Sequence, residues 1–454
     1  MLRRAGTKLW QALAGTFGTG PDLPPRPLDA GALRREYERR RWMVFLSVTF
    51  GYGFFYLCRL SFSMAKKPML DAGVLSESEM GYAGSVMLLV YSLGRFTNGV
   101  LADRANIRRF VSVGLLGSAL AHLLLGSTRG AVFFTVMWAV NGWFQSMGSA
   151  PCIVSLTQWF SASERGTRYG LWSIAHGIGE GLSFLLTSMA VAAWGWRWGF
   201  YCPGIFCLLV SIVLLRTLMD RPRAYGLPRV DAYRNDPEPE PVPEGGAGQR
   251  AQQWAVLRNW RVWVLGFSGA LIYITRYGIN NWGSLYLQEA RGYGVVEAGT
   301  LLAVQAVLGL LGSSLSGWIS DRFFGSRRNM LCLGMGAMLV SGMALLWLVP
   351  PGQRWLDTLA LSIVGFSLGG LVVYLGGLMA ADIVPQQATG TAMGLVGLLC
   401  YLGAAAQDGV SGELIGQGRR ALTGAAAYHE VMMFWVAAAA LAVLLTIAVQ
   451  KRRR

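Results

Sequence analysis

Two arginines lie inside apolar stretches that are long enough to cross a bilayer. Arg59 lies in FFYLCRLSFS, after the run WMVFLSVTFGYG, and Arg276 lies in LIYITRYGIN, after VWVLGFSGA. A guanidinium stays protonated in any protein environment, and placing it in hydrocarbon costs at least about 3 kcal/mol. Such a residue usually faces an internal cavity, so the two arginines predict a site that binds an anion.

The rest of the chain has the composition of a helical membrane protein. Its 454 residues are 53% hydrophobic and 14% charged, and a soluble chain of this length would need more polar surface. A helix crosses a hydrocarbon layer about 30 Å thick with about 20 apolar residues. Runs of this length predict twelve transmembrane helices, over residues 42–65, 79–102, 109–128, 131–153, 169–193, 198–217, 261–287, 297–319, 329–349, 356–380, 389–414 and 428–449.

The net charge of +16 comes from basic residues that cluster between alternate hydrophobic runs. The clusters lie at residues 34–41, 104–109, 165–168, 216–223 and 322–328 and in the closing KRRR. The intervening connections carry little excess positive charge, apart from Lys66 and Lys67. This positive-inside pattern places both termini in the cytoplasm. We therefore expect a multi-pass protein of the cytoplasmic (inner) membrane, whose partner is the lipid bilayer and not a nucleic acid.

Metal, cofactor and enzyme chemistry have little support in the sequence. The six cysteines are scattered, without the CxxC or Cys/His spacing of a metal site or a disulfide framework. There is no Gly-x-x-x-x-Gly-Lys-Ser/Thr loop for a nucleotide, and no nucleophile paired with a base. The sequence therefore predicts no metal and no cofactor, and a protein that is not an enzyme.

A polar connection from about Asp220 to Arg258 divides the chain into two sets of six spans. It contains the string NDPEPEPVPEGGAGQR, which is too polar and proline-rich to pack a core. We expect a cytoplasmic tail, an N-terminal half, a cytoplasmic linker, a C-terminal half and a basic cytoplasmic tail. Their predicted boundaries are residues 1–41, 42–219, 220–258, 259–450 and 451–454.

The same loop motif, Gly-x-x-x-Asp-Arg, follows the second span of each half. Its residues are Gly99, Asp103 and Arg104 in the first copy and Gly317, Asp321 and Arg322 in the second. Glycine allows two helices to approach closely, and the arginines anchor the loop at the cytoplasmic face. Two copies in register with a six-plus-six layout resemble the major facilitator superfamily. The resemblance implies an all-α fold, with two six-helix halves around a central cavity that opens alternately to each side.

Four segments carry a closer resemblance within this superfamily. They are FFYLCRLSF (54–62), YSLGRFTNG (91–99), LWSIAHGIG (171–179) and YITRYGINNWGSLY (273–286). These segments are similar to those of the organophosphate:phosphate antiporters, which include glycerol-3-phosphate, hexose-phosphate and glucose-6-phosphate transporters and a hexose-phosphate sensor. The resemblance implies a transporter that exchanges an organophosphate for inorganic phosphate.

The resemblance also implies which residues bind the phosphate. Arg59 and Arg276 match the two anion-binding arginines of the family, one from each half, and His176 matches its histidine on the fifth helix. Arg95 stands where these carriers typically have lysine. A guanidinium fork fits phosphate oxygens in a bidentate manner. An anion shared by the two halves would therefore couple substrate binding to closure.

Two carboxylates stand apart from the family pattern. Glu180 follows His176 by four residues, so the two side chains share a helix face and suit a proton relay. Asp408 lies in the eleventh span and could hold a sugar hydroxyl or a cationic part of the substrate. Burying either acid is costly unless it pairs or stays protonated. The structural alternative for both is an ion pair with a buried arginine, Arg95 or Arg276.

Aromatic and amide side chains complete the predicted site. The candidates for lining the sugar-binding part are Tyr52, Tyr56, Tyr273, Tyr277 and Trp282. Packing between helices is the alternative role for each of these rings. Asn281 replaces the acidic residue that the family commonly has before this tryptophan, and Leu60 replaces the lysine that usually follows the first arginine.

Three functions are compatible with these residues. The first is a carrier that exchanges a hexose phosphate, such as glucose 6-phosphate, for inorganic phosphate by alternating access. The second is a receptor for external hexose phosphate that signals to a membrane sensor kinase, since NNWGSLYL resembles the sensor branch. The third is a proton-coupled carrier of another organic anion, in which Glu180 and Asp408 would be the coupling groups.

Overall fold

The computed structural model describes residues 17–102, 105–236, 254–324, 328–384 and 389–448 of the 454-residue chain. Most of these residues are helical, and eleven of the described helices are long and apolar enough to cross a membrane. The prediction of an all-α membrane protein is therefore confirmed.

Seven helices form the N-terminal half, because the fourth predicted span is divided in two. They are α2 (Ala30–Asp71), α3 (Glu77–Ala102), α4 (Ile107–Gly126), α5 (Ala131–Gln145), α6 (Ser149–Trp159), α7 (Ala162–Trp194) and α8 (Trp198–Thr217). The division falls between α5 and α6. Pro151 has no N–H to donate to the carbonyl four residues earlier, and Gly148 is a poor helix former, so the helix is interrupted at this point.

The C-terminal half contains seven more α-helices. They are α11 (Trp260–Glu289), α12 (Val295–Phe324), α13 (Arg328–Leu348), α14 (Arg354–Val373), α15 (Met379–Asp382), α16 (Thr389–Ala421) and α17 (His429–Ala448). A π-helical turn, η2 (Tyr374–Leu378), joins α14 to α15, and a 3-10 turn, η4 (Gly424–Tyr428), precedes α17. With α5 and α6 counted as one span, the described helices occupy all twelve predicted positions.

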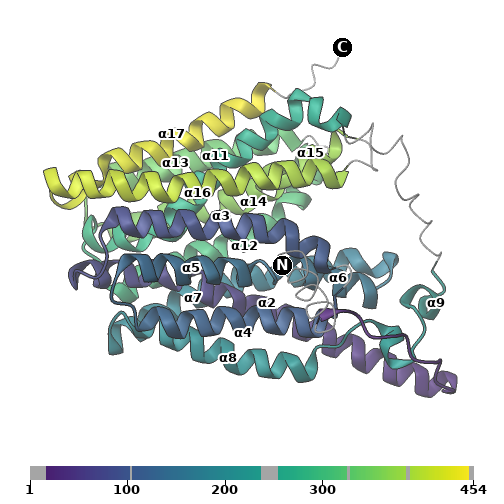
Figure 1. Ribbon diagram of the computed structural model, residues 1–454. Coiled ribbons are helices and arrows are strands. Elements are labelled where there is room, and N and C mark those ends of the chain that lie inside the picture. Colours follow the sequence, from purple (N-terminus) through teal and green to yellow (C-terminus); the bar gives the residue numbers. More distant parts are fainter. Residues whose placement is uncertain (1–16, 103–104, 237–253, 325–327, 385–388, 449–454) are drawn as a thin grey trace, which may run out of the picture.

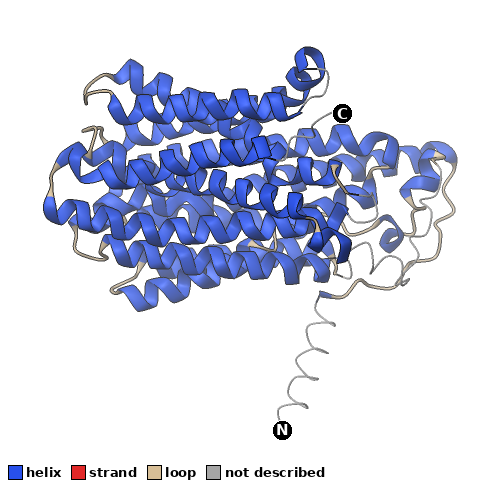
Figure 2. Cartoon of the chain, turned by 90° about the horizontal axis from the view of Figure 1, so that it is seen from above, coloured by secondary structure: helices blue, strands red, loops and turns tan. Residues whose placement is uncertain are grey.

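The helices lie side by side in one bundle (Figures 1 and 2), and the internal repeat that the sequence indicates recurs in how they pack. In the N-terminal half α2 packs on α7 and α8, α3 on α5, and α4 on α5 and α8. The equivalent helices of the C-terminal half pack in the same way, with α11 on α16 and α17, α12 on α14, and α13 on α14 and α17. The halves meet through α2 with α11, α3 with α16, and α7 with α12. The helices that carry Arg59 and Arg276 are therefore in contact across the centre.

The bundle has two ends, which we name by the segments found there. At the terminal face α2 begins, α8 ends, α11 begins and α17 ends, and η1 (Pro222–Tyr225) and α9 (Val230–Arg234) follow α8. At the distal face, residues 72–76, 290–294 and 422–423 connect consecutive helices. In Figure 1 the terminal face lies on the right, with α9.

The first part of the predicted linker is packed at the terminal face. The Leu23 N–H donates to the Arg223 carbonyl at 3.1 Å, and the Arg26 N–H donates to the Gly226 carbonyl at 3.0 Å. These bonds fasten the start of the linker to the segment that precedes α2. Residues 237–253, which include most of the proline-acidic string, lie outside the described residues.

The two glycines of the repeated loop motif occupy equivalent places near the terminal-face ends of α3 and α12. A Cβ on Gly99 or Gly317 would have nothing within 4 Å, so the close helix approach that we expected at this motif is not made at either glycine. Arg322 is exposed in the last turn of α12. Asp103 and Arg104 lie outside the described residues, as does the side chain of Asp321.

Candidate functional site

Arg59 is buried in the middle of α2 and has no carboxylate partner among the described residues. Its side chain is 7% exposed, and its Nε donates to Oε1 of Gln145 at 3.3 Å. The guanidinium lies over the rings of Tyr56 and Tyr91, 4.8 and 4.5 Å from their centroids. Its Nη2 makes no hydrogen bond within the described part of the chain. A permanent charge and an unused donor are therefore held in the protein interior.

Arg276 reaches from α11 to α7 of the other half. Its Nη2 lies 2.9 Å from His176 Nε2 and 3.1 Å from Oε2 of Glu180. Because Nε2 of His176 faces an N–H donor, it acts as the acceptor, which leaves Nδ1 to carry the ring proton. Asn280 donates to the second oxygen of Glu180 at 2.5 Å. Of the alternatives for Glu180, the structure shows the ion pair with a buried arginine.

His176 and Glu180 also approach each other on α7, as their spacing predicts. His176 Nε2 lies 3.7 Å from Glu180 Oε2. Helix α7 can come this close to α2 because Gly179 faces Gly53, where an added Cβ would lie 2.5 Å from the Gly53 carbonyl oxygen. The His176 ring is 4.9 Å from that of Tyr56, the ring under Arg59. Tyr56 therefore links the surroundings of the two arginines.

An aromatic cluster surrounds the arginines. The four predicted tyrosines belong to it: Tyr52 contacts Tyr56 with ring centroids 5.6 Å apart, and Tyr273 contacts Tyr277 at 5.8 Å. Three further members, which we did not predict, are Tyr91, Trp172 and Tyr401. Tyr91 could have been found from its place four residues before Arg95, on the same helix face. Tyr401 had no comparable signal.

Arg95 faces the C-terminal half from α3. Its guanidinium carbon is 5.3 Å from the centre of the Tyr401 ring, which also contacts Tyr91 at 5.0 Å. The residue is exposed, unlike Arg59, so it lies in a more open part of the interface. No described carboxylate forms an ion pair with it, and it does not contact Asp408.

Asp408 of α16 is held by two neutral donors of α11. Trp282 Nε1 donates to Oδ1 at 2.7 Å, and Asn281 Nδ2 donates to Oδ2 at 2.9 Å. The carboxylate lies directly against Gly84 of α3, where an added Cβ would be 1.9 Å from Oδ2. Asn281 and Trp282, both predicted site residues, thus donate hydrogen bonds to Asp408 in this structure.

The prediction that Lys66 lies in a connection between helices is wrong. We assigned Lys66 and Lys67 to a connection, but α2 continues to Asp71, and the Lys66 side chain is only 1% exposed. Its Nζ lies 3.2 Å from the centroid of the Trp282 ring. It lines a small cavity with Arg59 and Asp408. The overlooked signal was its position two helical turns after Arg59, on the same face of α2.

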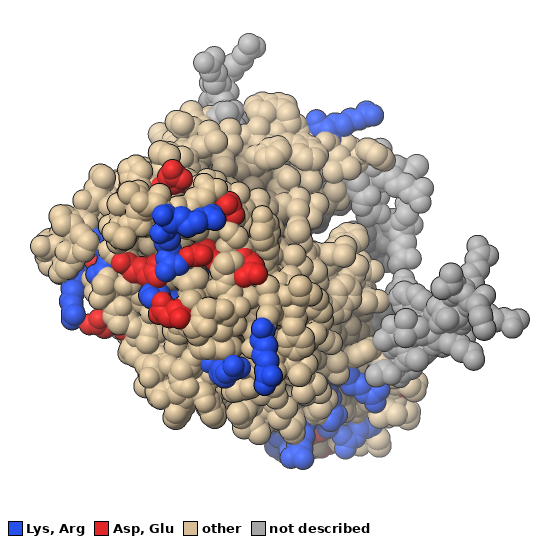
Figure 3. All heavy atoms as spheres, turned by 60° about the vertical axis from the view of Figure 1, so that its left-hand side comes forward, with Lys and Arg blue, Asp and Glu red and all other residues tan. Residues whose placement is uncertain are grey.

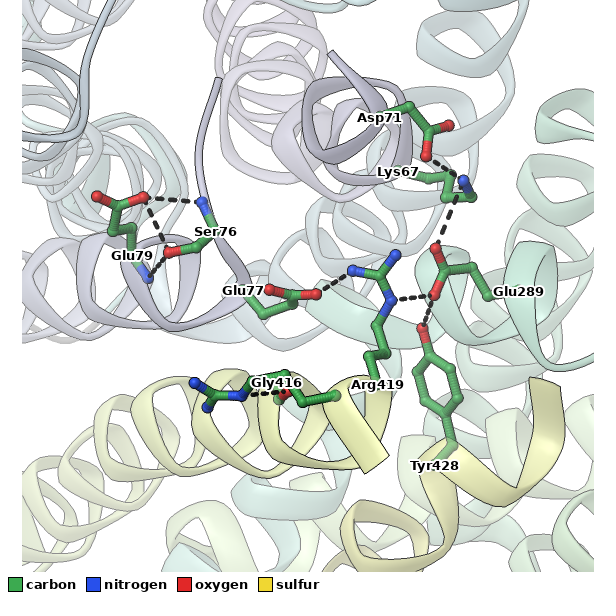
Figure 4. A network of polar contacts seen from close by, with 10 residues as sticks. Lys67, Asp71, Ser76, Glu77, Glu79, Glu289, Gly416, Arg419 and Tyr428 are labelled. Atoms are coloured by element: carbon green, nitrogen blue, oxygen red, sulfur yellow. Dashed lines mark hydrogen bonds and ion pairs between the residues drawn. The ribbon is translucent and has the colours of Figure 1, made fainter. Parts of the chain in front are cut away.

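The distal face is closed over this site by charged side chains from both halves (Figures 3 and 4). Arg419 pairs with Glu77 of the other half, and its Nε lies 2.9 Å from Oε2 of Glu289. Lys67 reaches the same Glu289 from α2 at 3.5 Å, and the Tyr428 hydroxyl donates to it at 2.7 Å. We call these five residues the distal cluster. Figure 3 shows acidic and basic side chains gathered near the centre of this face.

The fold and the buried charges together define a membrane protein of the transport type, and sequence comparison gives the family. Residues 31–407 match the Major Facilitator Superfamily. The chain belongs to this superfamily. Among solved structures it resembles a bacterial homologue of the human lysosomal transporter Spinster, with a TM-score of 0.74 and 16% identity, over 90% of this chain and 97% of that one.

Curated relatives are similar over most of both chains. A protein of Chlamydia trachomatis named "Probable hexose phosphate transport protein" is 33% identical over 83% of this chain and 85% of its own. The membrane sensor protein UhpC of Escherichia coli is 34% identical over 83% and 88%. The glycerol-3-phosphate transporter of Bacillus subtilis is 33% identical over 84% and 87%. These relatives agree with the expected resemblance to organophosphate transporters and their sensor branch.

Proposed function

We propose that this protein is a secondary carrier that exchanges a phosphorylated sugar or polyol for inorganic phosphate. The relatives named as hexose phosphate and glycerol-3-phosphate transporters support this function. The observation that carries it is the state of Arg59, a buried guanidinium that has, among the described residues, no carboxylate partner and no acceptor for its Nη2 donor. Phosphate oxygens are the natural acceptors for such a group.

The charge of the site suits a phosphate monoester. Arg276 pairs with a carboxylate directly, and Lys66 shares its cavity with one. Arg59 and Arg95 have no described carboxylate partner. A phosphate monoester carries between about −1.5 and −2 charges at neutral pH, which these two arginines would balance. Burying Arg59 without such an anion is costly, so ligand binding would relieve the cost.

Binding one anion to α2 and α11 together would couple the ligand to the movement of the halves. Arg276 would exchange its bond to Glu180 for bonds to phosphate, and Arg59 would use its free donor. The anion would then join the halves through charge-assisted hydrogen bonds. If the halves changed orientation with no anion bound, the positive charges of the arginines would stay uncompensated. This cost disfavours the return of the empty carrier, so exchange is favoured over net transport.

The proposal includes the orientation of the bundle in the membrane. Basic residues of the terminal face include Arg39, Arg40, Arg216, Arg221 and Arg223. By the positive-inside rule this face is cytoplasmic, so both termini would lie in the cytoplasm of a cell whose inner membrane holds the protein. The distal cluster would then close the external side.

The test is exchange in proteoliposomes made from the purified protein. Vesicles loaded with inorganic phosphate should take up labelled glucose 6-phosphate or glycerol 3-phosphate, and vesicles without internal phosphate should take up little. Uptake that ignores internal phosphate but collapses with an uncoupler would instead support the proton-coupled carrier. Absence of uptake for every phosphate monoester, with ligand binding also absent, would overturn the proposal.

A receptor is the second candidate, because the UhpC sensor is as similar to this chain as the transporters are. A receptor would use the same arginines to bind external hexose phosphate and would transmit the signal to a membrane sensor kinase. Saturable binding of glucose 6-phosphate to the purified protein without exchange in proteoliposomes would favour it. Exchange at a rate well above that of an Arg59→Lys variant would exclude a pure receptor.

A further inference from the structure

One face of α2 carries three buried polar groups that lack hydrogen-bond partners within the described residues. They are Nη2 of Arg59, Oγ of Ser63 and Nζ of Lys66. Positions four and seven residues apart lie on the same side of a helix, so the three groups form a row that runs from Arg59 toward the distal face. Leaving a polar group unpaired in a protein interior costs about 1–3 kcal/mol, and more for a charged group. Three such groups in one row therefore point to a binding site for a ligand that would pair with them.

All three residues line one small cavity between the halves. Its volume is about 20 Å³, enough for roughly one water molecule. The other half contributes Tyr277, Asn281 and Asp408 to the wall. The row on α2 consists of donors, whereas Asp408 presents an acceptor. Trp282 and Asn281 each donate one bond to this carboxylate, which has about four lone-pair sites, so it can accept more.

We propose that Ser63, Lys66 and Asp408 form a second subsite, which binds the hydroxyl groups of the substrate while Arg59 binds its phosphate. This inference rests on the proposed transport of phosphate monoesters and specifies the part of the substrate that is not phosphate. A hydroxyl both accepts and donates a hydrogen bond. It can accept from Lys66 or Ser63 and donate to Asp408. A carboxylate on the ligand, in addition to its phosphate, would instead be repelled by the Asp408 carboxylate.

The subsite must widen before a sugar can enter it. The wall contains residues of both halves, and the distal side is held shut by close contacts between α3 and α16, such as the Ser85 hydroxyl donating to the Ala405 carbonyl at 2.6 Å. Parting of these helices would enlarge the cavity and admit a polyol next to Arg59. The subsite is therefore fully formed for a sugar when the distal face is open, and compressed in the present conformation.

The experiment compares the affinities of inorganic phosphate, glycerol 3-phosphate and glucose 6-phosphate for the purified full-length protein. Ser63→Ala and Lys66→Met should each weaken glucose 6-phosphate binding, by about tenfold for Lys66→Met, and leave the affinity for inorganic phosphate within about twofold. Asp408→Asn should also weaken glucose 6-phosphate and should improve binding of 3-phosphoglycerate, which carries an additional carboxylate.

Lys67→Met is the matched control, because it removes the same charge at the next position, where the side chain belongs to the distal cluster and pairs with Glu289. It should change the affinities for phosphate and glucose 6-phosphate in parallel. Lys66→Arg retains charge and donors and should recover part of the sugar-phosphate affinity, which separates a binding role from a folding defect.

Two results would overturn the subsite. If Ser63→Ala and Lys66→Met leave both affinities unchanged, the row does not contact the ligand. If they weaken phosphate and glucose 6-phosphate equally, the row acts on the phosphate site or on the fold. These results differ from a failure of the proposed function. In that case the unmodified protein would bind neither inorganic phosphate nor glucose 6-phosphate.

Discussion

Arg276 of α11 and Glu180 of α7 form an ion pair between the two halves, with Nη2 3.1 Å from Oε2. The exposed fractions of their side chains are 16% and 6%. A buried pair of this kind is held by mutual attraction, and breaking it without a replacement is costly. In the proposed function an incoming phosphate would be such a replacement for the arginine. The pair would then give up Arg276 in exchange for an anion.

Glu180→Gln should strengthen the binding of inorganic phosphate, because phosphate would no longer compete with a carboxylate for Arg276. The gain should be about tenfold, the size expected for one charge-assisted hydrogen bond. The exchange rate should fall, since the empty carrier would hold an unbalanced arginine. Calorimetric titration and proteoliposome exchange give the two values. Unchanged phosphate affinity would mean that the ion pair survives ligand binding.

Arg59→Lys should weaken phosphate binding about 10–100-fold although the charge is kept. An ammonium cannot reproduce the planar donor fork, and its shorter reach would remove the donor that Arg59 gives to Oε1 of Gln145. The measurement is the dissociation constant for inorganic phosphate. Arg354→Lys is a suitable control, since the Arg354 side chain is 74% exposed and pairs with Glu297 at the surface. Near-normal affinity in Arg59→Lys would remove Arg59 from the site.

Apolar run lengths and a repeated loop were sufficient to predict the fold. Bilayer thickness fixes the length of a span, which is why the predicted positions agree with the helices. The break in the fourth span was missed because Gly148 and Pro151 lie inside a run that is otherwise long enough. The two arginines could be found for a similar physical reason, since a permanent charge stands out in an apolar stretch.

The surroundings of those arginines depend on packing that spacing within one helix does not reveal. The approach of His176 to Glu180 was predictable because it lies within α7. The pairing of Glu180 with Arg276, and the contact of Lys66 with Trp282, join helices that are far apart in the sequence. Without the arrangement of the halves, Lys66 looked like an ordinary residue of a connection.

Arg419→Glu should loosen the distal face, because it places a third carboxylate beside Glu77 and Glu289. A cysteine introduced at Ser85, behind the distal cluster, would report this opening. Its reaction with a membrane-impermeant thiol reagent applied from the distal side should become about tenfold faster, which corresponds to 1.4 kcal/mol. The background rate of the six native cysteines is subtracted using the protein without the Ser85→Cys change.

The double variant Glu77→Arg with Arg419→Glu tests whether this effect comes from the pairing of charges. It restores opposite charges across the halves, so the labelling rate at position 85 should return toward its original value. A double variant that remains as reactive as Arg419→Glu alone would show that the distal cluster does not hold the halves together.

Gly84→Ala should disturb the contact between α3 and α16. The added Cβ would lie 1.9 Å from Oδ2 of Asp408, and overpacking of this kind costs about 1–3 kcal/mol. We expect a lower thermal unfolding temperature in detergent. Gly99→Ala on the same helix has nothing within 4 Å of its Cβ and should be neutral or slightly stabilising, because alanine favours a helix over glycine. Combining Gly84→Ala with Asp408→Ala should recover stability relative to Gly84→Ala, since the clashing carboxylate is gone. Equal unfolding temperatures for Gly84→Ala and Gly99→Ala would show that Asp408 does not need the space that Gly84 provides.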